Sequence, residues 1–172
     1  INASSSFLST GGLRIGQWFF PDWRPGGHGI TNVRHALADS VNTFFYIVGG
    51  GYNDFTGLGA ETISKYLKKF GFGTKINTEL QSPATGFVPT PQWKQENKKE
   101  QWYVGDTYHL SIGQGDLTVT PLHIARMTAY FASEGKWTEP HVVIDENQPT
   151  PSVTETLGVD NNLTPGIDPQ NI

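Results

Sequence analysis

The residues with the clearest potential for chemistry are a serine and an asparagine separated by one valine, Ser40-Val41-Asn42. A hydroxyl both donates and accepts hydrogen bonds, and a carboxamide does both in a fixed geometry. Side chains two positions apart on a regular helix point roughly 200° apart. Ser40 and Asn42 therefore serve one site only if the helix breaks between Asp39 and Asn42. A simpler interpretation is that Asp39 or Ser40 only caps a helix over residues 43–48.

The histidines give little support for a metal site. His28 lies in a glycine-rich turn with Asp22 nearby, which fits either part of a metal site or the packing of a loop. His35 and His123 fall on expected helices, and no His-x-x-x-His or Glu-x-x-His pair occurs. The chain has no cysteine, which excludes disulfides and cysteine-bound zinc. We therefore expect no metal and no other cofactor, and we favour loop packing for His28.

Other patterns that mark common catalytic or binding sites are absent or weak. No Gly-x-Ser-x-Gly occurs, and no glycine cluster continues into the Gly-Lys-Ser/Thr of a phosphate-binding loop. The five Trp residues are spread over separate segments, which favours core packing and loop anchoring. A carbohydrate-binding module that stacks sugars on these rings stays open as an alternative.

The composition is that of a folded domain rather than a disordered chain or a nucleic-acid-binding protein. Aromatic residues make up 12% of the 172 residues and charged residues only 16%, whereas disordered chains show the opposite bias. The net charge is −4 and no basic run is longer than the two residues of Lys98-Lys99, which argues against nucleic acid as a partner. No apolar run approaches the roughly 20 residues that span a bilayer. The chain begins with Ile rather than Met.

The spacing of apolar residues, Gly and Pro predicts a mixture of strands and helices. Frequent Gly and Pro in residues 1–29 indicate short strands or extended chain. A helix is expected from residue 33 to 48, capped by Thr31 or Asn32 and ended by the glycines at 49–51. Further helices are expected over 60–70 and 121–133, the last apolar nearly all round and so buried. Residues 73–103 read as a long loop with a short helix near 91–99, and 140–144 as a strand.

Several short segments follow one another in an order that is informative as a set, although each alone is weak. The segments are Gly27-His28-Gly29, Ala38-Asp39-Ser40-Val41-Asn42-Thr43-Phe44-Phe45-Tyr46, Phe70-Gly71-Phe72-Gly73, Gly86-Phe87-Val88-Pro89-Thr90, Trp93-Lys94, Trp102-Tyr103-Val104-Gly105-Asp106-Thr107, Ile112-Gly113-Gln114-Gly115, Thr118-Val119-Thr120-Pro121-Leu122 and Pro140-His141-Val142-Val143. In their order and their residues they resemble class B penicillin-binding proteins, most closely the elongation type, over about residues 11–143.

The resemblance implies an acyl-transfer site that includes Ser40 and Asn42. The family arranges three motifs around one cleft, Ser-x-x-Lys, Ser-x-Asn/Asp and Lys-Thr/Ser-Gly, and Ser40-Val41-Asn42 matches the middle one. By resemblance both residues are catalytic: Ser40 relays or orients protons beside the nucleophile, and Asn42 binds the backbone amide of the substrate. The implied fold is the α/β (α+β) transpeptidase fold shared with serine β-lactamases, of which this chain would hold mostly the helical part.

The other two motifs of the family are not found in their usual form. Ser64-Lys65 and Ser133-Glu134-Gly135-Lys136 have the wrong spacing or context for the nucleophile, and no Lys-Thr-Gly or Lys-Ser-Gly occurs. We therefore expect an internal piece of a longer enzyme, incomplete at both ends and inactive alone. Residues 1–145 would be a partial transpeptidase domain, and 146–172 a polar, proline-rich connecting segment of the same domain.

The resemblance also implies a reaction, partners and a location for the parent enzyme. It would be a peptidoglycan D,D-transpeptidase that binds stem peptides and β-lactams beside a glycan-polymerising cell-wall partner. It would work at the extracytoplasmic face of the bacterial cell envelope, anchored in the membrane by a segment that this chain lacks. The alternative is a non-catalytic, wall-associated binding or scaffolding domain on the same fold.

Overall fold

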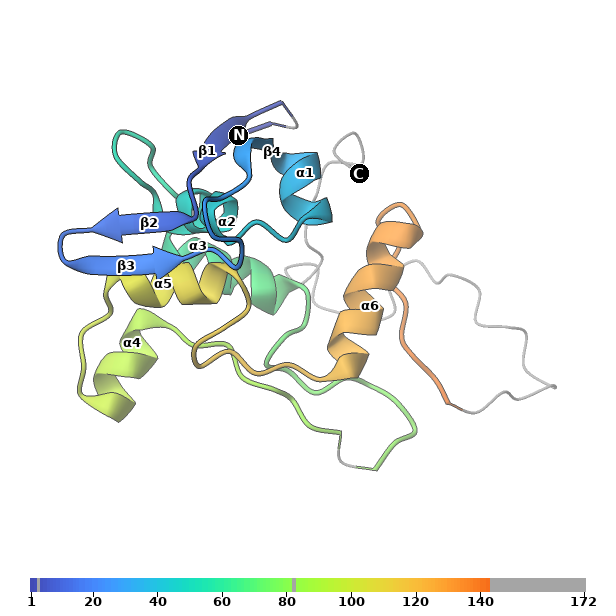
Figure 1. The fold of residues 1–172 in the computed structure, drawn as a ribbon. Helices are drawn as coiled ribbons and strands as arrows, with labels where there is room; N and C mark the ends of the chain where they lie inside the picture. Colours follow the sequence, from blue (N-terminus) through green and yellow to red (C-terminus); the bar gives the residue numbers. More distant parts are fainter. Residues whose placement is uncertain (3, 82, 143–172) are drawn as a thin grey trace. The chain divides into compact units, whose positions relative to one another are not determined.

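The computed structural model describes residues 1–2, 4–81 and 83–142 of the chain. Short strands come first and helices follow, so the expected α+β composition is confirmed. No helix among these residues is both long and apolar enough to cross a bilayer. The elements (Figure 1) are β1 Ser6–Ser9, β2 Gly12–Ile15, β3 Trp18–Pro21, β4 Gly29–Asn32, α1 Val33–Ala38, α2 Asn42–Gly50, α3 Gly59–Lys69, α4 Pro91–Trp93, the π-helix η1 Lys94–Lys98, α5 Val104–Ser111 and α6 Pro121–Ala132.

The chain divides into two compact units. Among the described residues, the first comprises Ile1–Ile63 and Pro89–Asp116, and the second comprises Ser64–Val88 and residues 117–142. All four strands belong to the first unit, together with Ser40 and Asn42. The expected boundary at residue 145 and the expected connecting segment 146–172 lie outside the described residues.

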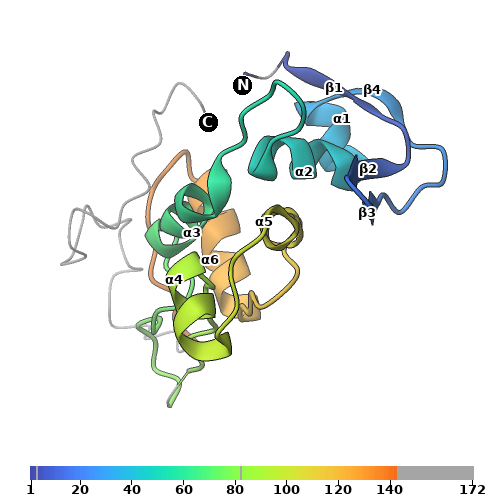
Figure 2. The same ribbon diagram turned by 90° about the vertical axis from the view of Figure 1, so that its left-hand side faces the viewer.

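Two antiparallel strand pairs open the first unit, as the frequent glycines and prolines predicted. β1 pairs with β4 and places Ser6 opposite Asn32, and β2 pairs with β3 and places Gly12 opposite Pro21. Figure 2 shows both pairs beside α1 and α2, and the first three strands pack against α2. Asn32 ends β4 and caps α1 as predicted, because its side chain accepts the backbone N–H of His35 at 3.0 Å.

The core of the first unit is built on α2. Tyr46 and Ile47 of this helix pack against Leu13 of β2 and Tyr108 of α5. The Tyr108 side chain is fully buried, and its hydroxyl donates to the carbonyl oxygen of Gly51 at 2.7 Å. Strand, helix and loop therefore meet at one aromatic cluster, which sets the position of α2 and of the residues that precede it.

The glycine run ends α2 as predicted, but only through its third member. Gly49 and Gly50 still belong to the helix, and Gly51, with φ 82°, ends it. A Cβ atom on Gly49 or Gly50 would collide with Ser111 or Tyr108 of α5. The first two glycines therefore let α5 approach α2 closely, and the third permits the left-handed turn.

Helix α5 was missing from the elements expected from the sequence. Its buried residues are Thr107, Tyr108 and Leu110, a set with too few aliphatic side chains to show a helical period. The start of the helix is set by a polar contact, because the Asp106 carboxylate accepts the backbone N–H of Tyr103 at 2.8 Å. Packing against α2 and this contact stabilise a helix that hydrophobic periodicity did not reveal.

In the second unit the expected helix over 121–133 is present but is not buried all round. Thr120 caps α6 and Pro121 begins it, as predicted. Its buried residues include the polar His123 and Arg126, whereas Ile124 and Phe131 are 42% and 45% exposed. The expectation was wrong because the two polar side chains find internal partners, so hydrophobicity alone does not identify the buried face.

The remaining core of the second unit consists of Phe70, Phe72, Val88 and Tyr130. The strand expected over 140–144 is not formed in its described part, residues 140–142, and its last two residues lie outside the described chain. The helix expected over 60–70 and the short helix near 91–99 are confirmed as α3 and as α4 followed by η1.

Candidate active site

The helix expected over residues 33–48 is interrupted, and the break lies where a shared site at Ser40 and Asn42 requires it. α1 ends with Asp39 as its C-cap residue, and α2 begins at Asn42. Between them Ser40 has φ 52°, in the left-handed region that non-glycine residues rarely adopt. The N–H of Val41 donates to the carbonyl oxygen of Ala36 at 3.0 Å, which is the six-to-one bond of a Schellman motif. Ser40 thus occupies the position where such motifs usually carry glycine, at a strain cost of about 1–2 kcal/mol.

The break directs Ser40 and Asn42 away from the core. Val41 between them is fully buried against Ala36 and Phe44, and its backbone is extended. Ser40 before it is exposed and Asn42 after it is half-buried. The geometry therefore allows both side chains to face one ligand.

The simpler interpretation, in which Asp39 or Ser40 caps α2, is wrong. The N-cap residue of α2 is Val41, whose side chain cannot accept a hydrogen bond. The acceptor comes instead from the loop after β3. The backbone N–H of Thr43 donates to Oδ2 of Asp22 at 2.9 Å, and the Thr43 hydroxyl donates to the same oxygen at 2.7 Å. A residue about twenty positions earlier in the chain therefore satisfies the start of α2.

Asp22 is held as a carboxylate by these donors. Burial alone would raise its pKa, but the hydroxyl and backbone N–H of Thr43, the backbone N–H of Trp23 and the neighbouring His28 together hold the pKa below its ordinary value. Negative charge at the first turn of a helix is also favoured by the helix dipole. Asp22 is consequently a charged acceptor at the start of α2.

His28 contacts this carboxylate within the loop, as loop packing predicts. Its Nε2 lies 3.6 Å from Oδ1 of Asp22, and its backbone N–H donates to the Ser9 hydroxyl at 3.3 Å. The ring stacks edge-on against Trp23 at 5.2 Å between centroids. Among the described residues no group of three or more His, Cys, Asp or Glu side chains comes close enough to hold a metal ion.

The serine with Ser-x-x-Lys spacing occupies a different setting. Ser133 is the C-cap residue of α6, and its hydroxyl donates to the backbone carbonyl oxygen of Lys136 at 2.8 Å. Glu134 has φ 57° and Gly135 has φ 87°, so the segment is a left-handed turn rather than a helix. On a helix, the Ser and Lys of this motif, three positions apart, would share one face. The turn therefore agrees with the expectation that Ser133 is not the nucleophile of the family motif.

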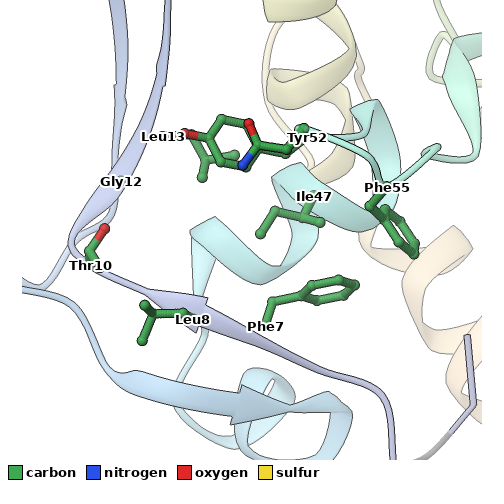
Figure 3. Close-up of a pocket in the computed structure, with 9 residues that line it drawn as sticks. Phe7, Leu8, Thr10, Gly12, Leu13, Ile47, Tyr52 and Phe55 are labelled. Carbon is green, nitrogen blue, oxygen red and sulfur yellow. The ribbon is translucent and has the colours of Figure 1, made fainter.

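A separate cavity of about 330 Å³ lies on another part of α2. Figure 3 shows Ile47 of α2 beside Phe7 of β1 and Phe55, with Leu13 and Tyr52 further along. The lining is mainly apolar and does not include Ser40 or Asn42. This cavity is consequently not the candidate active site.

Asp22, Trp23 and Thr43, which make hydrogen bonds to the turn before α2 or at its end, were not among the site residues expected from the sequence. One signal for such an outside contact is present in the sequence. Val41 would be the N-cap residue of a helix that begins at Asn42, and its side chain is not polar. The start of that helix needs an acceptor from elsewhere. Periodicity and motif spacing do not reveal which distant residue supplies it.

Comparison with known proteins places this chain in one family. The penicillin binding protein transpeptidase domain matches residues 3–164. The peptidoglycan D,D-transpeptidase MrdA of Acinetobacter baumannii is 39% identical over 124 residues, which cover 72% of this chain and 18% of that protein. The chain thus spans about a fifth of the length of the curated relatives it matches.

Solved structures show the same fold. Pseudomonas aeruginosa PBP2, determined in complex with WCK 5153, matches with a TM-score of 0.78 and 30% identity over 98% of this chain and 37% of that one. Helicobacter pylori PBP2, determined in complex with MreC, matches with a TM-score of 0.76 and 34% identity over 87% of this chain and 27% of that one. The transpeptidase fold expected from the sequence is thereby confirmed.

Proposed function

The chain belongs to the penicillin binding protein transpeptidase domain family, and on that premise we propose that it forms one wall of the active site of a peptidoglycan D,D-transpeptidase. The observation that carries the proposal is the placement of Ser40 and Asn42. Both leave the core on either side of the buried Val41, at a break between two helices. The strained backbone of Ser40 adds support, because such strain persists mostly at functional sites.

The proposed reaction is acyl transfer in two steps. A serine oxygen attacks the carbonyl carbon between the last two D-alanines of a stem peptide, the C–N bond breaks, and the terminal D-alanine leaves with a proton on its nitrogen. An amine of a neighbouring strand then attacks the ester and releases the serine. Dividing an amide exchange into two ester steps is ordinary covalent catalysis. β-Lactams would enter as substrate mimics and stop at the acyl-enzyme.

Ser40 and Asn42 have separate roles in this proposal. The Ser40 hydroxyl passes or orients the proton that moves between the attacking serine and the leaving nitrogen, because a hydroxyl can donate and accept at once. The Asn42 carboxamide binds the backbone amide of the stem peptide through one donor and one acceptor. The exposed Ser40 and half-buried Asn42 leave both groups available for these tasks.

The deciding experiment measures acylation by a labelled penicillin in the complete natural polypeptide that contains this sequence. Ser40→Ala should slow acylation by at least about 100-fold, the lower range of general acid–base contributions, with little change in folding. The matched control is Ser133→Ala, which removes the serine with Ser-x-x-Lys spacing and should acylate at the normal rate. A normal acylation rate for Ser40→Ala would show that Ser40 has only a structural role.

A second experiment uses the 172-residue chain by itself. We expect no stable covalent penicillin adduct, because its Ser133-x-x-Lys136 match lies in a turn and no other Ser-x-x-Lys supplies a nucleophile. Mass spectrometry of the purified chain after incubation with penicillin is the measurement. An adduct on Ser133 would overturn this part of the proposal.

Partners and location follow from the same premise. We propose that the protein acts in the bacterial cell envelope, outside the cytoplasm, and works with a glycan-polymerising enzyme. The structure of a Helicobacter pylori relative in complex with MreC supports a protein partner for this chain. Membrane anchoring through another segment, and stem peptides and β-lactams as ligands, are part of the proposal.

A further inference from the structure

Two consecutive residues of the loop after β3 contact both ends of the turn that carries Ser40. The indole N–H of Trp23 donates to the carbonyl oxygen of Asp39 at 2.9 Å, directly before Ser40. Oδ2 of Asp22 accepts the hydroxyl and the backbone N–H of Thr43, directly after Asn42. The turn is therefore held on both sides by one dipeptide that is far from it in sequence.

The dipeptide is itself fixed to the strands and to α2. The backbone N–H of Asp22 donates to the carbonyl oxygen of Gly11 at 2.8 Å, next to β2. The carbonyl oxygen of Pro21 accepts the Tyr46 hydroxyl at 3.2 Å, and the Ser9 hydroxyl lies 3.4 Å from Oδ2 of Asp22. The Asp22 side chain has no exposed surface. The two contacts to the turn consequently start from a rigid support.

The turn needs such support for two local reasons. Ser40 adopts a left-handed conformation that favours glycine, so the backbone at Ser40 has a lower-energy alternative when nothing holds it. Val41, the N-cap residue of α2, offers no side-chain acceptor, so the first N–H groups of that helix need a partner from outside. Trp23 restrains the residue before the strained one, and Asp22 supplies the missing acceptor.

We propose that Asp22 and Trp23 are positioning residues for the reaction: together with Thr43 they clamp the 39–43 turn so that Ser40 and Asn42 face the substrate in a fixed geometry. This inference rests on the function proposed above for Ser40 and Asn42. The clamp acts through hydrogen bonds to the backbone and to Thr43, and it does not itself take part in bond making. A small displacement of a proton-relay group has a large effect on rate, which makes the clamp measurable.

The test uses variants that remove one hydrogen bond each, in the complete natural polypeptide. Thr43→Val removes the hydroxyl donor to Asp22 and keeps the shape of a fully buried side chain. Trp23→Phe removes the indole donor to Asp39 and keeps an aromatic ring. Thr43→Ser restores a hydroxyl. The matched control is Trp18→Phe, on a Trp of the β2–β3 hairpin that is 67% exposed.

Rapid-mixing kinetics with a fluorescent penicillin separate the non-covalent dissociation constant from the acylation rate constant. We expect Trp23→Phe to lower the acylation rate constant by about 3- to 10-fold and Thr43→Val by about 10-fold or more, the ranges of a neutral and a charge-assisted hydrogen bond. For Thr43→Val, whose side chain cannot reach a ligand, the dissociation constant should change less than about 2-fold. Thr43→Ser and Trp18→Phe should acylate like the wild type.

Amide hydrogen exchange gives a readout that does not depend on activity. In Trp23→Phe and Thr43→Val the amides of the 39–43 turn should exchange faster, while those of α5 keep their wild-type rates. Wild-type acylation together with unchanged exchange at the turn would overturn the clamp. A uniform rise of exchange across the first unit would also overturn it, since that marks general destabilisation. If the wild type itself is not acylated, the proposed function fails, and exchange at the turn still decides the clamp.

Discussion

Thr43 gives both of its hydrogen-bond donors to one oxygen of Asp22, the hydroxyl at 2.7 Å and the backbone N–H at 2.9 Å. The pair joins the loop after β3 to the first turn of α2, and both side chains are buried. Because these donors favour the charged form, they hold the pKa of Asp22 below its ordinary value in spite of burial.

The low pKa of Asp22 makes part of the stability dependent on acid. A carboxyl group whose pKa is lowered by folding stabilises the protein above its unfolded pKa, and that contribution is lost as the pH falls through the folded pKa. We expect the unfolding free energies of the wild type and Thr43→Val to differ by about 1.5–3 kcal/mol at pH 7. The difference should shrink below about pH 4, the ordinary range of an Asp pKa.

The difference in unfolding free energy is measured by urea unfolding of both proteins at several pH values. Hydrogen exchange at the α2 amides provides a second measurement. A gap that stays constant down to pH 2 would contradict a contribution of Thr43 that depends on the charge of Asp22 in this pH range.

Ser40 is expected to show a conflict between stability and activity. Its left-handed backbone costs an L-residue about 1–2 kcal/mol, and glycine avoids that cost but loses about 0.4–1 kcal/mol through its freer unfolded chain. Ser40→Gly should therefore be more stable than Ser40→Ala by about 0.5–1 kcal/mol, while both acylate at a similar, strongly reduced rate. Thermal unfolding and penicillin acylation of the two variants measure this. A Ser40→Gly variant less stable than Ser40→Ala would contradict the left-handed conformation.

Asn42 should tolerate aspartate better than alanine. The family pattern accepts Asn or Asp at this position, and both side chains offer an oxygen acceptor to the substrate amide. We expect Asn42→Ala to lower kcat/KM for a stem-peptide substrate by about 10- to 100-fold, and Asn42→Asp to lose less. These losses in kcat/KM should be seen with stem-peptide substrates of several lengths. Equal losses in the two variants would argue that the amide nitrogen, rather than the oxygen, makes the essential contact.

His123 is expected to stabilise the second unit through polar contacts. Its side chain is fully buried and stacks on Phe72, with Nδ1 2.6 Å from the Thr120 hydroxyl and Nε2 3.0 Å from the carbonyl oxygen of Thr74. His123→Phe keeps the ring but leaves the Thr74 carbonyl without its donor, which should cost about 1–3 kcal/mol.

Urea unfolding compares this variant with His35→Phe, a change at an exposed position of α1 that should stay within about 0.5 kcal/mol. Equal stability of the two variants would mean that the contacts of His123 contribute nothing.

Local signals in the sequence predicted much of the fold. Thr120 and Pro121 mark the start of α6, and Asn32 marks the start of α1, because caps and first-turn prolines act within a few residues. Gly51 and Gly71 mark helix ends, since their left-handed backbones favour glycine. Helix α5 was missed, because it depends on contacts with α2 rather than on a local pattern. The buried face of α6 was misjudged, because the polar side chains of His123 and Arg126 are buried through contacts outside the helix, with Thr74 and Glu139.

The sequence by itself was enough to predict a shared motif at Ser40 and Asn42, the helix break that such a motif requires, and the family that the ordered segments resemble. These conclusions depend on residue types and on short spacings, which are read directly along the chain. Only the tertiary structure decided how the break is held: Ser40 takes a position that favours glycine, and Asp22 and Trp23 contact the two ends of its turn. A hydrogen bond between residues about twenty positions apart leaves no periodic trace in the sequence, because its geometry exists only once strands and helices have packed.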